Sequence, residues 1–453
     1  MTTGLGENGF IAFIGKVNGK AGTFYGVQLD RAGGKNNGTV DGTRYFSCPE
    51  SHGVFVREEN IQVKKSSNEL NDKYMEDFHG ALASMGVAPP HESSDERIGR
   101  FKHDDFLGSF SGKNCDSTGN WNSGPKNPQG MLCDVSDRPL LCSSVSSTGQ
   151  EVVLGGSDHS LRIYDVNSGK LKRQLYSKRF GHSEWVTCCS YCPDGTVISG
   201  GMDSKLCIWR GVQSLDLEGH RGSVSKVIVT SKGGHAISCS YDKTVRIWNL
   251  RSKIESACMT GHKAPILEMG MSNGGLITGS RDGQLLFWDL VRCKMTQRSE
   301  EHDGHVTALH CDDNGLIVSG DQSGTMRLWD SRTGGSIHAA CIHPGGAVNC
   351  IKSHGGTIVS AGADRMLNIL DERKMDQVLK QIDSHKDYIY SLNVSDCHIF
   401  SGSGDGMVLV HDIQTGTLNY GLGANRAGVR CIELTYRNMI TAGDDGTAMV
   451  YQF

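Results

Sequence analysis

The sequence lacks several features that would place the protein in other classes. No apolar run approaches the length that spans a bilayer, and the opening MTTGLGENGFIAF has neither the basic start nor the apolar core of a secretory signal. The formal net charge is −4, so the excess of Lys and Arg that binds duplex nucleic acid is missing. We therefore expect a soluble, intracellular protein that binds neither membranes nor nucleic acid.

Clustered cysteines are also missing. The 16 cysteines are scattered over 453 residues, and several, such as Cys207 and Cys239, lie in apolar strand-like runs. The grouping that comes closest to a cluster is Cys188, Cys189 and Cys192, and no histidine pair follows it at zinc-ligand spacing. The sequence predicts reduced thiols, no metal site and no cofactor.

Proline is scarce and glycine is abundant, with 9 and 59 residues. Glycine adopts positive φ without steric cost and therefore favours tight turns between short strands. Together with a hydrophobic fraction of 37%, this composition predicts an all-β protein. Because the chain exceeds the usual size of one domain, we expect two folded units.

Short alternating runs recur from about Arg138 to the end of the sequence. Each ends on an aromatic or apolar residue before a final polar one, at Tyr164, Trp209, Trp248, Trp288, Trp329, Leu370, His411 and Tyr451. Their mean spacing is about 41 residues, which fits four short strands with their turns. This spacing predicts the blades of a β-propeller.

Gly-His pairs and S-G-x-x-D turns mark these repeats, and with them residues 138–453 resemble the WD-repeat family. The Gly-His pairs end at His182, His220, His262 and His305. In that family a His, a strand Ser or Thr, a turn Asp and a Trp form a hydrogen-bonded tetrad in each blade. The resemblance assigns complete tetrads to three blades: His182, Ser199, Asp203 and Trp209; His220, Ser238, Asp242 and Trp248; His262, Thr278, Asp282 and Trp288.

A catalytic interpretation of these sets is an alternative, because His, Ser and Asp also build hydrolytic triads. Catalysis needs one such set, whereas these recur with the repeat, so we favour a structural role and no enzymatic activity. Two blades depart from the pattern. Ser323 stands where the turn Asp is expected, and Leu154 stands where the strand Ser is expected. We therefore expect the tetrad hydrogen bonds to hold both blades together less firmly.

The last repeat ends two residues before the end of the sequence, so its blade needs an outer strand from elsewhere. An open sheet edge invites aggregation. The run GMLCDVSD, around Met131 to Val135, directly precedes the first repeat and is the natural donor. We predict a closed ring, with eight blades favoured over seven.

Residues 9–63 contain the short strand-like runs FIAFIG, FYGVQLD and GVFVREENIQV, which predict a small barrel-like domain. Between the second and third runs, GKNNG spans Gly34 to Gly38 and precedes TVDGTRYFSCPESHGVFVR. This stretch closely resembles the CAP-Gly domain, the microtubule-binding module found in the largest subunit of dynactin. Asn37 replaces the family's usual Asp, and the first strand of the family is short or missing here.

The resemblance implies a groove that binds the acidic, aromatic C-terminal tails of α-tubulin and of end-binding proteins. Its expected residues are Lys35, Asn36, Asn37, Gly38, Phe24, Phe13, Phe46, Phe55 and Arg44. A cation and an amide on a glycine-rich loop suit a terminal carboxylate, and backbone N–H groups could approach it closely. The alternative is that Phe13 and Phe46 belong to the core, and that Lys35 and Asn36 form an ordinary solvated turn.

A connector separates the two units and divides the chain into residues 1–66, 67–128 and 129–453. Apolar residues at helical spacing predict an amphipathic helix over about 69–85, which we expect to pack within the chain. From His91 to Gln129 the sequence is polar and rich in Gly, Ser and Asn, which indicates a flexible or draped linker. Such a tether would let the propeller search a broad volume around the first module.

These features lead to the hypothesis of a cytoplasmic, cytoskeletal scaffold that binds microtubules through a tubulin tail and recruits or anchors another protein with its propeller. A cilium, a flagellum with its axoneme, or a centriole would suit this pairing. One alternative is a plus-end or transport adaptor that binds end-binding-protein tails. The other is a substrate receptor of a ubiquitin ligase, which the absence of an F-box-like helical segment disfavours.

Overall fold

Among the residues that the structure describes, strands make up almost all the regular structure, as the composition predicts. The computed structural model describes residues 2–3, 9–17, 23–29, 34–41, 43–45, 48, 50–57, 61–62, 121–176, 181–312 and 314–453. The predicted helix at about 69–85 and the connector as far as residue 120 lie outside these ranges. No helix within them has the length and apolar character needed to cross a bilayer.

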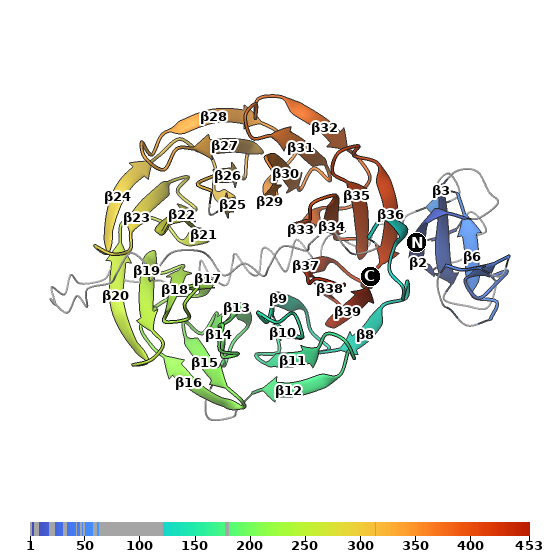
Figure 1. The fold of residues 1–453 in the computed structure, drawn as a ribbon, viewed down its shortest axis with the longest axis horizontal. Coiled ribbons are helices and arrows are strands. Elements are labelled where there is room, and N and C mark those ends of the chain that lie inside the picture. The colour runs from blue at the N-terminus through green and yellow to red at the C-terminus, as the bar shows by residue number, and fades with distance from the viewer. Residues whose placement is uncertain are drawn as a thin grey trace.

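Eight antiparallel sheets form a closed ring, the blades of a propeller, with the first strand of each blade nearest the centre (Figure 1). Blades 1 to 4 consist of β9 (Leu140–Val145), β10 (Glu151–Gly156), β11 (Leu161–Asp165), β12 (Leu171–Leu175); β13 (Val186–Tyr191), β14 (Val197–Gly201), β15 (Leu206–Arg210), β16 (Gln213–Leu217); β17 (Val224–Val229), β18 (His235–Ser240), β19 (Thr244–Asn249), β20 (Ile254–Thr260); β21 (Ile266–Ser272), β22 (Gly275–Ser280), β23 (Leu285–Asp289) and β24 (Lys294–Ser299). Blades 5 to 8 consist of β25 (Val306–Cys311), β26 (Ile317–Asp321), β27 (Thr325–Trp329), β28 (Ser336–Cys341); β29 (Val348–His354), β30 (Thr357–Gly362), β31 (Leu367–Asp371), β32 (Val378–Ile382); β33 (Ile389–Val394), β34 (His398–Ser403), β35 (Met407–Asp412), β36 (Leu418–Gly423); β37 (Val429–Leu434), β38 (Asn438–Gly443), β39 (Thr447–Gln452) and β8 (Met131–Asp134). The prediction of eight blades is confirmed.

The core of the ring lies between neighbouring blades. Every residue of β14 is buried, because both faces of this second strand are covered by other blades. Glycine permits the close approach: a Cβ on Gly200 would lie 2.6 Å from Cγ1 of Val224 in the next blade. Between blades 2 and 3 the apolar cluster also includes Cys188 and Cys192, and burial raises the pKa of the Cys192 thiol to about 12.

The ring closes by pairing two distant parts of the chain. Strand β8 is the outer strand of blade 8, with Met131 opposite Val450 and Asp134 opposite Thr447 in β39. This is the donor strand that the sequence predicts. Directly before it, the 3-10 turn η3 (Trp121–Ser123) places the Trp121 ring 3.9 Å from that of Phe453, so residues of the predicted connector cover this edge of the propeller.

Seven strands are present among the described residues of the N-terminal module. They are β1 (Thr2–Thr3), β2 (Gly9–Lys16), β3 (Thr23–Leu29), β4 (Thr39–Val40), β5 (Thr43–Arg44), β6 (Gly53–Val56) and β7 (Ile61–Gln62). Strands β2, β3 and β6 form an antiparallel sheet, β4 pairs with β5, and the two-residue β1 pairs with β7. A first strand is therefore present but short.

The module lies beside blade 7 in Figure 1, and β2 pairs with the outer strand of that blade. Phe13 faces Leu422, and Ile14 faces Gly421. One sheet of seven strands therefore runs from the propeller into the module. This pairing differs from the expected tether with a broad search volume, because a module joined to a blade by a strand ladder does not search freely.

Candidate functional site

The GKNNG loop, Gly34 to Gly38, follows β3 and lies against the start of β6. The amides of Lys35 and Asn36 donate to the carbonyl of Gly53 over 2.8 and 3.1 Å, and the Gly53 amide donates to the carbonyl of Asn36 over 2.7 Å. A Cβ on Gly34 would lie 2.6 Å from the Gly53 oxygen, and one on Gly53 would lie 2.4 Å from Oδ1 of Asn36. Only glycine fits at both positions.

The loop's backbone donors are largely used within the module. Besides the two amides on Gly53, the Gly34 amide donates to Ser51, and the Gly38 amide donates to Oδ1 of Asn36 over 3.0 Å. Gly38 has a φ of 90°, which favours glycine. The amides of Gly34, Lys35, Asn36 and Gly38 are therefore already hydrogen-bonded, and the expectation that backbone N–H groups bind a ligand does not hold for these four. Side-chain donors of the loop are the ammonium of exposed Lys35 and the amide nitrogen of half-buried Asn36.

Aromatic side chains lie on the strands next to this loop. Phe24 in β3 and Phe55 in β6 are both half-buried. The rings of Phe55 and Tyr45 are in an edge-to-face arrangement with centroids 5.5 Å apart. The guanidinium of Arg57 lies 5.6 Å from the centroid of the Phe24 ring, a cation–π contact. The structure thus provides apolar ring surface beside cationic groups.

The remaining groove predictions have different outcomes. Arg44 is exposed, and Asn37 is half-buried with its carbonyl accepting from the Cys48 amide over 3.3 Å. Phe13 is described only by its backbone, in the β2 ladder, and Phe46 lies outside the described residues. Tyr45 is a residue that the sequence reasoning missed. The sequence signal for Tyr45 was its position between two predicted groove residues, Arg44 and Phe46.

The blade tetrads are a second group of predicted residues. In blade 2, His182 Nδ1 lies 3.0 Å from Asp203, His182 Nε2 lies 2.8 Å from Ser199 Oγ, and the Trp209 indole donates to the same Oγ over 2.9 Å. Because a carboxylate only accepts, Nδ1 carries the proton and Nε2 accepts from the hydroxyl. Ser199 is fully buried, so its hydroxyl does not face a substrate.

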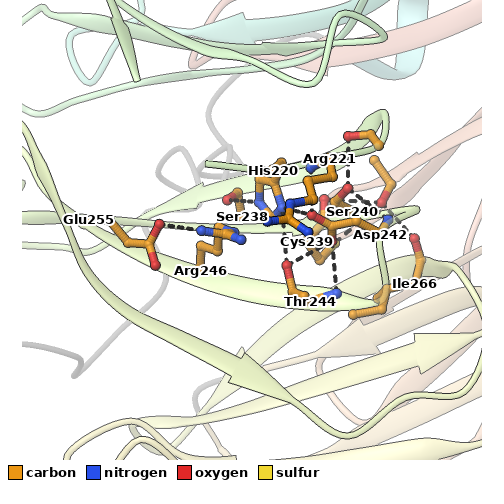
Figure 2. A network of polar contacts seen from close by, with 12 residues as sticks. His220, Arg221, Ser238, Cys239, Ser240, Asp242, Thr244, Arg246, Glu255 and Ile266 are labelled. Atoms are coloured by element: carbon orange, nitrogen blue, oxygen red, sulfur yellow. Dashed lines mark hydrogen bonds and ion pairs between the residues drawn. The ribbon is translucent and has the colours of Figure 1, made fainter. Parts of the chain in front are cut away.

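Blade 3 repeats this arrangement with further bonds, and Figure 2 shows its network around His220 and Asp242. Their side chains are 2.8 Å apart, and Thr244 Oγ1 donates to the same carboxylate over 2.7 Å. Although burial acts to raise it, the pKa of the Asp242 carboxyl lies well below its ordinary value because of the hydrogen bond to His220. Burial holds the pKa of His220 below its ordinary value.

Blade 4 brings three of its four members within hydrogen-bond distance. His262 Nε2 lies 2.7 Å from Thr278 Oγ1, which also accepts from the Trp288 indole over 2.8 Å. The link to Asp282 is longer, with His262 Nδ1 3.9 Å from its Oδ1, and this buried nitrogen makes no hydrogen bond.

Blade 5 corrects the sequence interpretation. Its histidine is His302 rather than His305, and its acid is Asp321, two residues after the strand Ser319 rather than four. Ser323, in the place expected for the acid, donates its hydroxyl to Asp321 over 2.6 Å. The expectation of a weakly tied blade was wrong here, because Asp321 accepts both from the histidine and from the turn.

Blade 1 has no tetrad, because Leu154 stands in the place of the strand Ser and is buried in the core. Its turn acid, Asp158, accepts instead from the Arg162 guanidinium over 2.6 Å. No group of three or more potential metal ligands occurs in the part of the chain that the structure describes.

Comparisons with known proteins agree with these two architectures. Residues 2–61 match the CAP-Gly domain. Residues 173–210, 211–249, 293–330 and 376–412 match the WD domain, G-beta repeat. The chain therefore contains an N-terminal CAP-Gly domain and an eight-bladed propeller with WD repeats.

Individual relatives resemble one part or the other. Dynactin subunit 1 of Gallus gallus is 50% identical over 60 residues, 13% of this chain and 5% of that protein. The guanine nucleotide-binding protein subunit beta of Arabidopsis thaliana is 29% identical over 243 residues, 47% of this chain and 64% of that protein. Telomerase protein component 1 of Rattus norvegicus is 26% identical over 206 residues, 42% of this chain and 8% of that protein. In each case the match spans less than two thirds of the relative.

Among solved structures, the computationally designed Ika8 protein matches with a TM-score of 0.64 and 23% identity. The match covers 71% of this chain and 98% of that one. At this identity the likeness concerns the fold alone.

Proposed function

We propose that the protein is a microtubule-associated, non-enzymatic scaffold. Its CAP-Gly groove binds the C-terminal tail of tubulin, and its propeller recruits or anchors another protein. The observation that carries the proposal is the GKNNG loop, which is hydrogen-bonded to Gly53 and presents exposed Lys35, together with the cation–π contact of Arg57 with Phe24 on the neighbouring strands. The match of residues 2–61 to the CAP-Gly domain and the dynactin relative support it.

The chemistry of such a tail suits the groups in the groove. A terminal carboxylate pairs with the Lys35 ammonium and accepts from the amide nitrogen of Asn36. A terminal aromatic ring packs against the half-buried phenylalanines, where edge-to-face contacts are favourable. Acidic residues upstream in the tail meet Arg44 and Arg57, both exposed, so each pair contributes little alone.

The propeller is the recruiting element because its fold presents many loops and no catalytic constellation in the residues described. The buried tetrads serve the fold. By this proposal the protein belongs to the cytoskeleton, and an axoneme, a flagellum or a centriole is its expected place.

Co-sedimentation with microtubules tests the groove. Lys35→Ala removes the exposed cation while its backbone stays bound to Gly53, and Asn36→Asp removes the amide donor while keeping the Oδ1 that caps Gly38. We expect the double variant to lose binding, and removal of the terminal tyrosine from α-tubulin to weaken the binding of the unmodified protein. Lys232→Ala, at an exposed propeller lysine, is the matched control. Unchanged binding in both tests contradicts tail capture.

A second candidate keeps the groove and changes its ligand to the tail of an end-binding protein, which would make the chain a plus-end or transport adaptor. The same carboxylate and ring chemistry supports it. Competition between a tubulin tail peptide and an end-binding tail peptide separates the two, because the preferred tail displaces the other at lower concentration.

A further inference from the structure

Blade 7 differs from the other blades in its outer strand. Strand β36 pairs with β35 on one side and with β2 of the CAP-Gly domain on the other. The resulting order is β33-β34-β35-β36-β2-β3-β6, whereas the other seven blade sheets have four strands each within the described residues.

The sequence of β36 suits a covered edge. It reads LNYGLG, without Asp, Glu, Lys or Arg, and Tyr420, Gly421 and Leu422 are buried. Six other outer strands carry at least one charged residue, namely LKRQL, QSLDL, IESACMT, KMTQRS, VLKQI and MLCD, and the seventh, SIHAAC, carries none. Charges protect an exposed edge from pairing with another chain, so their absence fits an edge that is already paired.

Side chains also cross this junction. Val27, Leu29 and Val54 of the CAP-Gly domain form one apolar cluster with Met407 and Leu409 of blade 7. Val56 and Leu418 are partly buried against the same cluster. Met407 is 3% exposed and Leu409 is 2% exposed in this cluster.

The groove lies on the opposite face of the same strands. Side chains alternate along a strand, so in β6 Val54 and Val56 face the junction with blade 7, and Phe55 between them points the other way. In β3 the same alternation separates Val27 and Leu29 from Phe24. A ligand in the groove and the propeller behind the sheet therefore do not compete for the same surface.

We propose that the outer edge of blade 7 is the permanent docking site for this chain's own CAP-Gly domain, joined by β2–β36 pairing and the apolar cluster. The domain and the propeller then move as one rigid body, and the GKNNG loop is held in a fixed orientation to the propeller axis. This inference goes beyond the proposed function and holds whichever tail the groove binds.

The repeat supplies matched variants for the test. Leu418 stands opposite His411, Val378 of blade 6 stands opposite Leu370, and Leu171 of blade 1 stands opposite Tyr164. All three begin an outer strand at the same register. Only Leu418 belongs to the junction, whereas Leu171 is 51% exposed and Val378 is 38% exposed. Leu418→Lys places a charge in the junction, and Leu171→Lys and Val378→Lys are the controls.

Small-angle scattering of the full chain measures the result. We expect Leu418→Lys to increase the maximum dimension, because the released domain extends away from the ring, while both controls match the unmodified protein. Circular dichroism verifies that each variant is folded. A folded Leu418→Lys protein with unchanged dimensions overturns the proposal.

Hydrogen exchange of the unmodified chain gives a second test that needs no variant. Outward-pointing amides of β36 should exchange at least roughly tenfold more slowly than those of β32, whose outer side has no strand partner within the described residues. Equal rates in the two strands overturn the proposal even if Leu418→Lys does not fold. Neither test involves microtubules, so a failure here is distinct from a failure of tail binding.

Discussion

The Nδ1 atom of His302 lies 2.8 Å from Oδ2 of Asp321, and both side chains are almost completely buried. The other carboxylate oxygen, Oδ1, accepts from the amides of Ser323 and Thr325 over 2.9 and 3.0 Å. One aspartate therefore ties the loop before blade 5 to the turn between β26 and β27. Trp329 completes the set by donating to Ser319 over 2.7 Å.

Asp321→Ala should lower the free energy of unfolding by about 3 kcal/mol, because it leaves several buried donors without an acceptor. Denaturant unfolding monitored by tryptophan fluorescence measures this. Asp303→Ala removes an exposed carboxylate one residue after His302 and should change the value by less than about 0.5 kcal/mol. Equal effects of the two substitutions would mean that the buried link does not stabilise the blade.

Blade 7 should be sensitive to acid. Burial lowers the pKa of His385 to about 3 and that of His411 to about 4, against an ordinary value of 6.5. As the pH falls below 6.5 the unfolded chain binds protons that the folded chain does not, so stability is lost from pH 6.5 down to about 4 for His411 and about 3 for His385. Each histidine contributes at most about 1.4 kcal/mol per pH unit in this range.

His385→Asn should therefore flatten the decrease in thermal midpoint between pH 6.5 and 4.5. The control is His159→Asn, the same substitution at a half-buried loop histidine of blade 1. The slope is the informative quantity, because the variant also loses the 2.6 Å contact between His385 and Ser401 at every pH. An unchanged slope in His385→Asn would show that this histidine titrates normally.

Alanine substitutions at two turn glycines of similar φ distinguish the cost of the backbone conformation from the cost of a steric clash. Gly446 has a φ of 74°, and a Cβ there would lie 2.0 Å from the carbonyl oxygen of Ser136. Gly211 has a φ of 64° with nothing within 4 Å of the added atom. Gly211→Ala should cost about 1 kcal/mol through conformation alone, and Gly446→Ala several times more, because its Cβ would also clash with the carbonyl of Ser136, two residues after the closing strand β8. Similar unfolding midpoints in the two variants would contradict a tight junction at the closure.

Binding of an acidic tail peptide should weaken as salt is raised, because Lys35, Arg44 and Arg57 are exposed and screened by ions. Fluorescence anisotropy with a labelled tubulin tail peptide measures the affinity. We expect a decrease of roughly fivefold between 50 and 200 mM salt, and a smaller relative decrease in Lys35→Ala. A salt-independent affinity would indicate that ring packing dominates the interaction.

The features predicted from the sequence are those set by local pattern. The spacing of the blade-ending residues identifies the repeats, and the missing outer strand of the last blade points to Met131–Asp134. The GKNNG motif identifies the N-terminal domain, and its glycines have local reasons: a Cβ on Gly34 would lie 2.6 Å from the Gly53 oxygen, and Gly38 has a φ of 90°.

The features that were missed depend on contacts between segments. His302 was overlooked because EHDGH contains a second histidine in the expected Gly-His pair, and only the fold selects the histidine that reaches Asp321. The junction between β2 and β36 has no motif, since any two complementary edges can pair. The absence of charge in LNYGLG fits the junction, but SIHAAC of blade 5 shares it, so charge alone did not identify the paired edge.

The pairing of β8 with β39 has a consequence for how the protein is made. A nascent chain emerging from the ribosome carries β8 without its partner while seven blades form, because β39 begins only at Thr447. A premature stop codon before Thr447 would leave the ring unsealed and β8 without its partner, so the truncated product should be sent to chaperones and proteases.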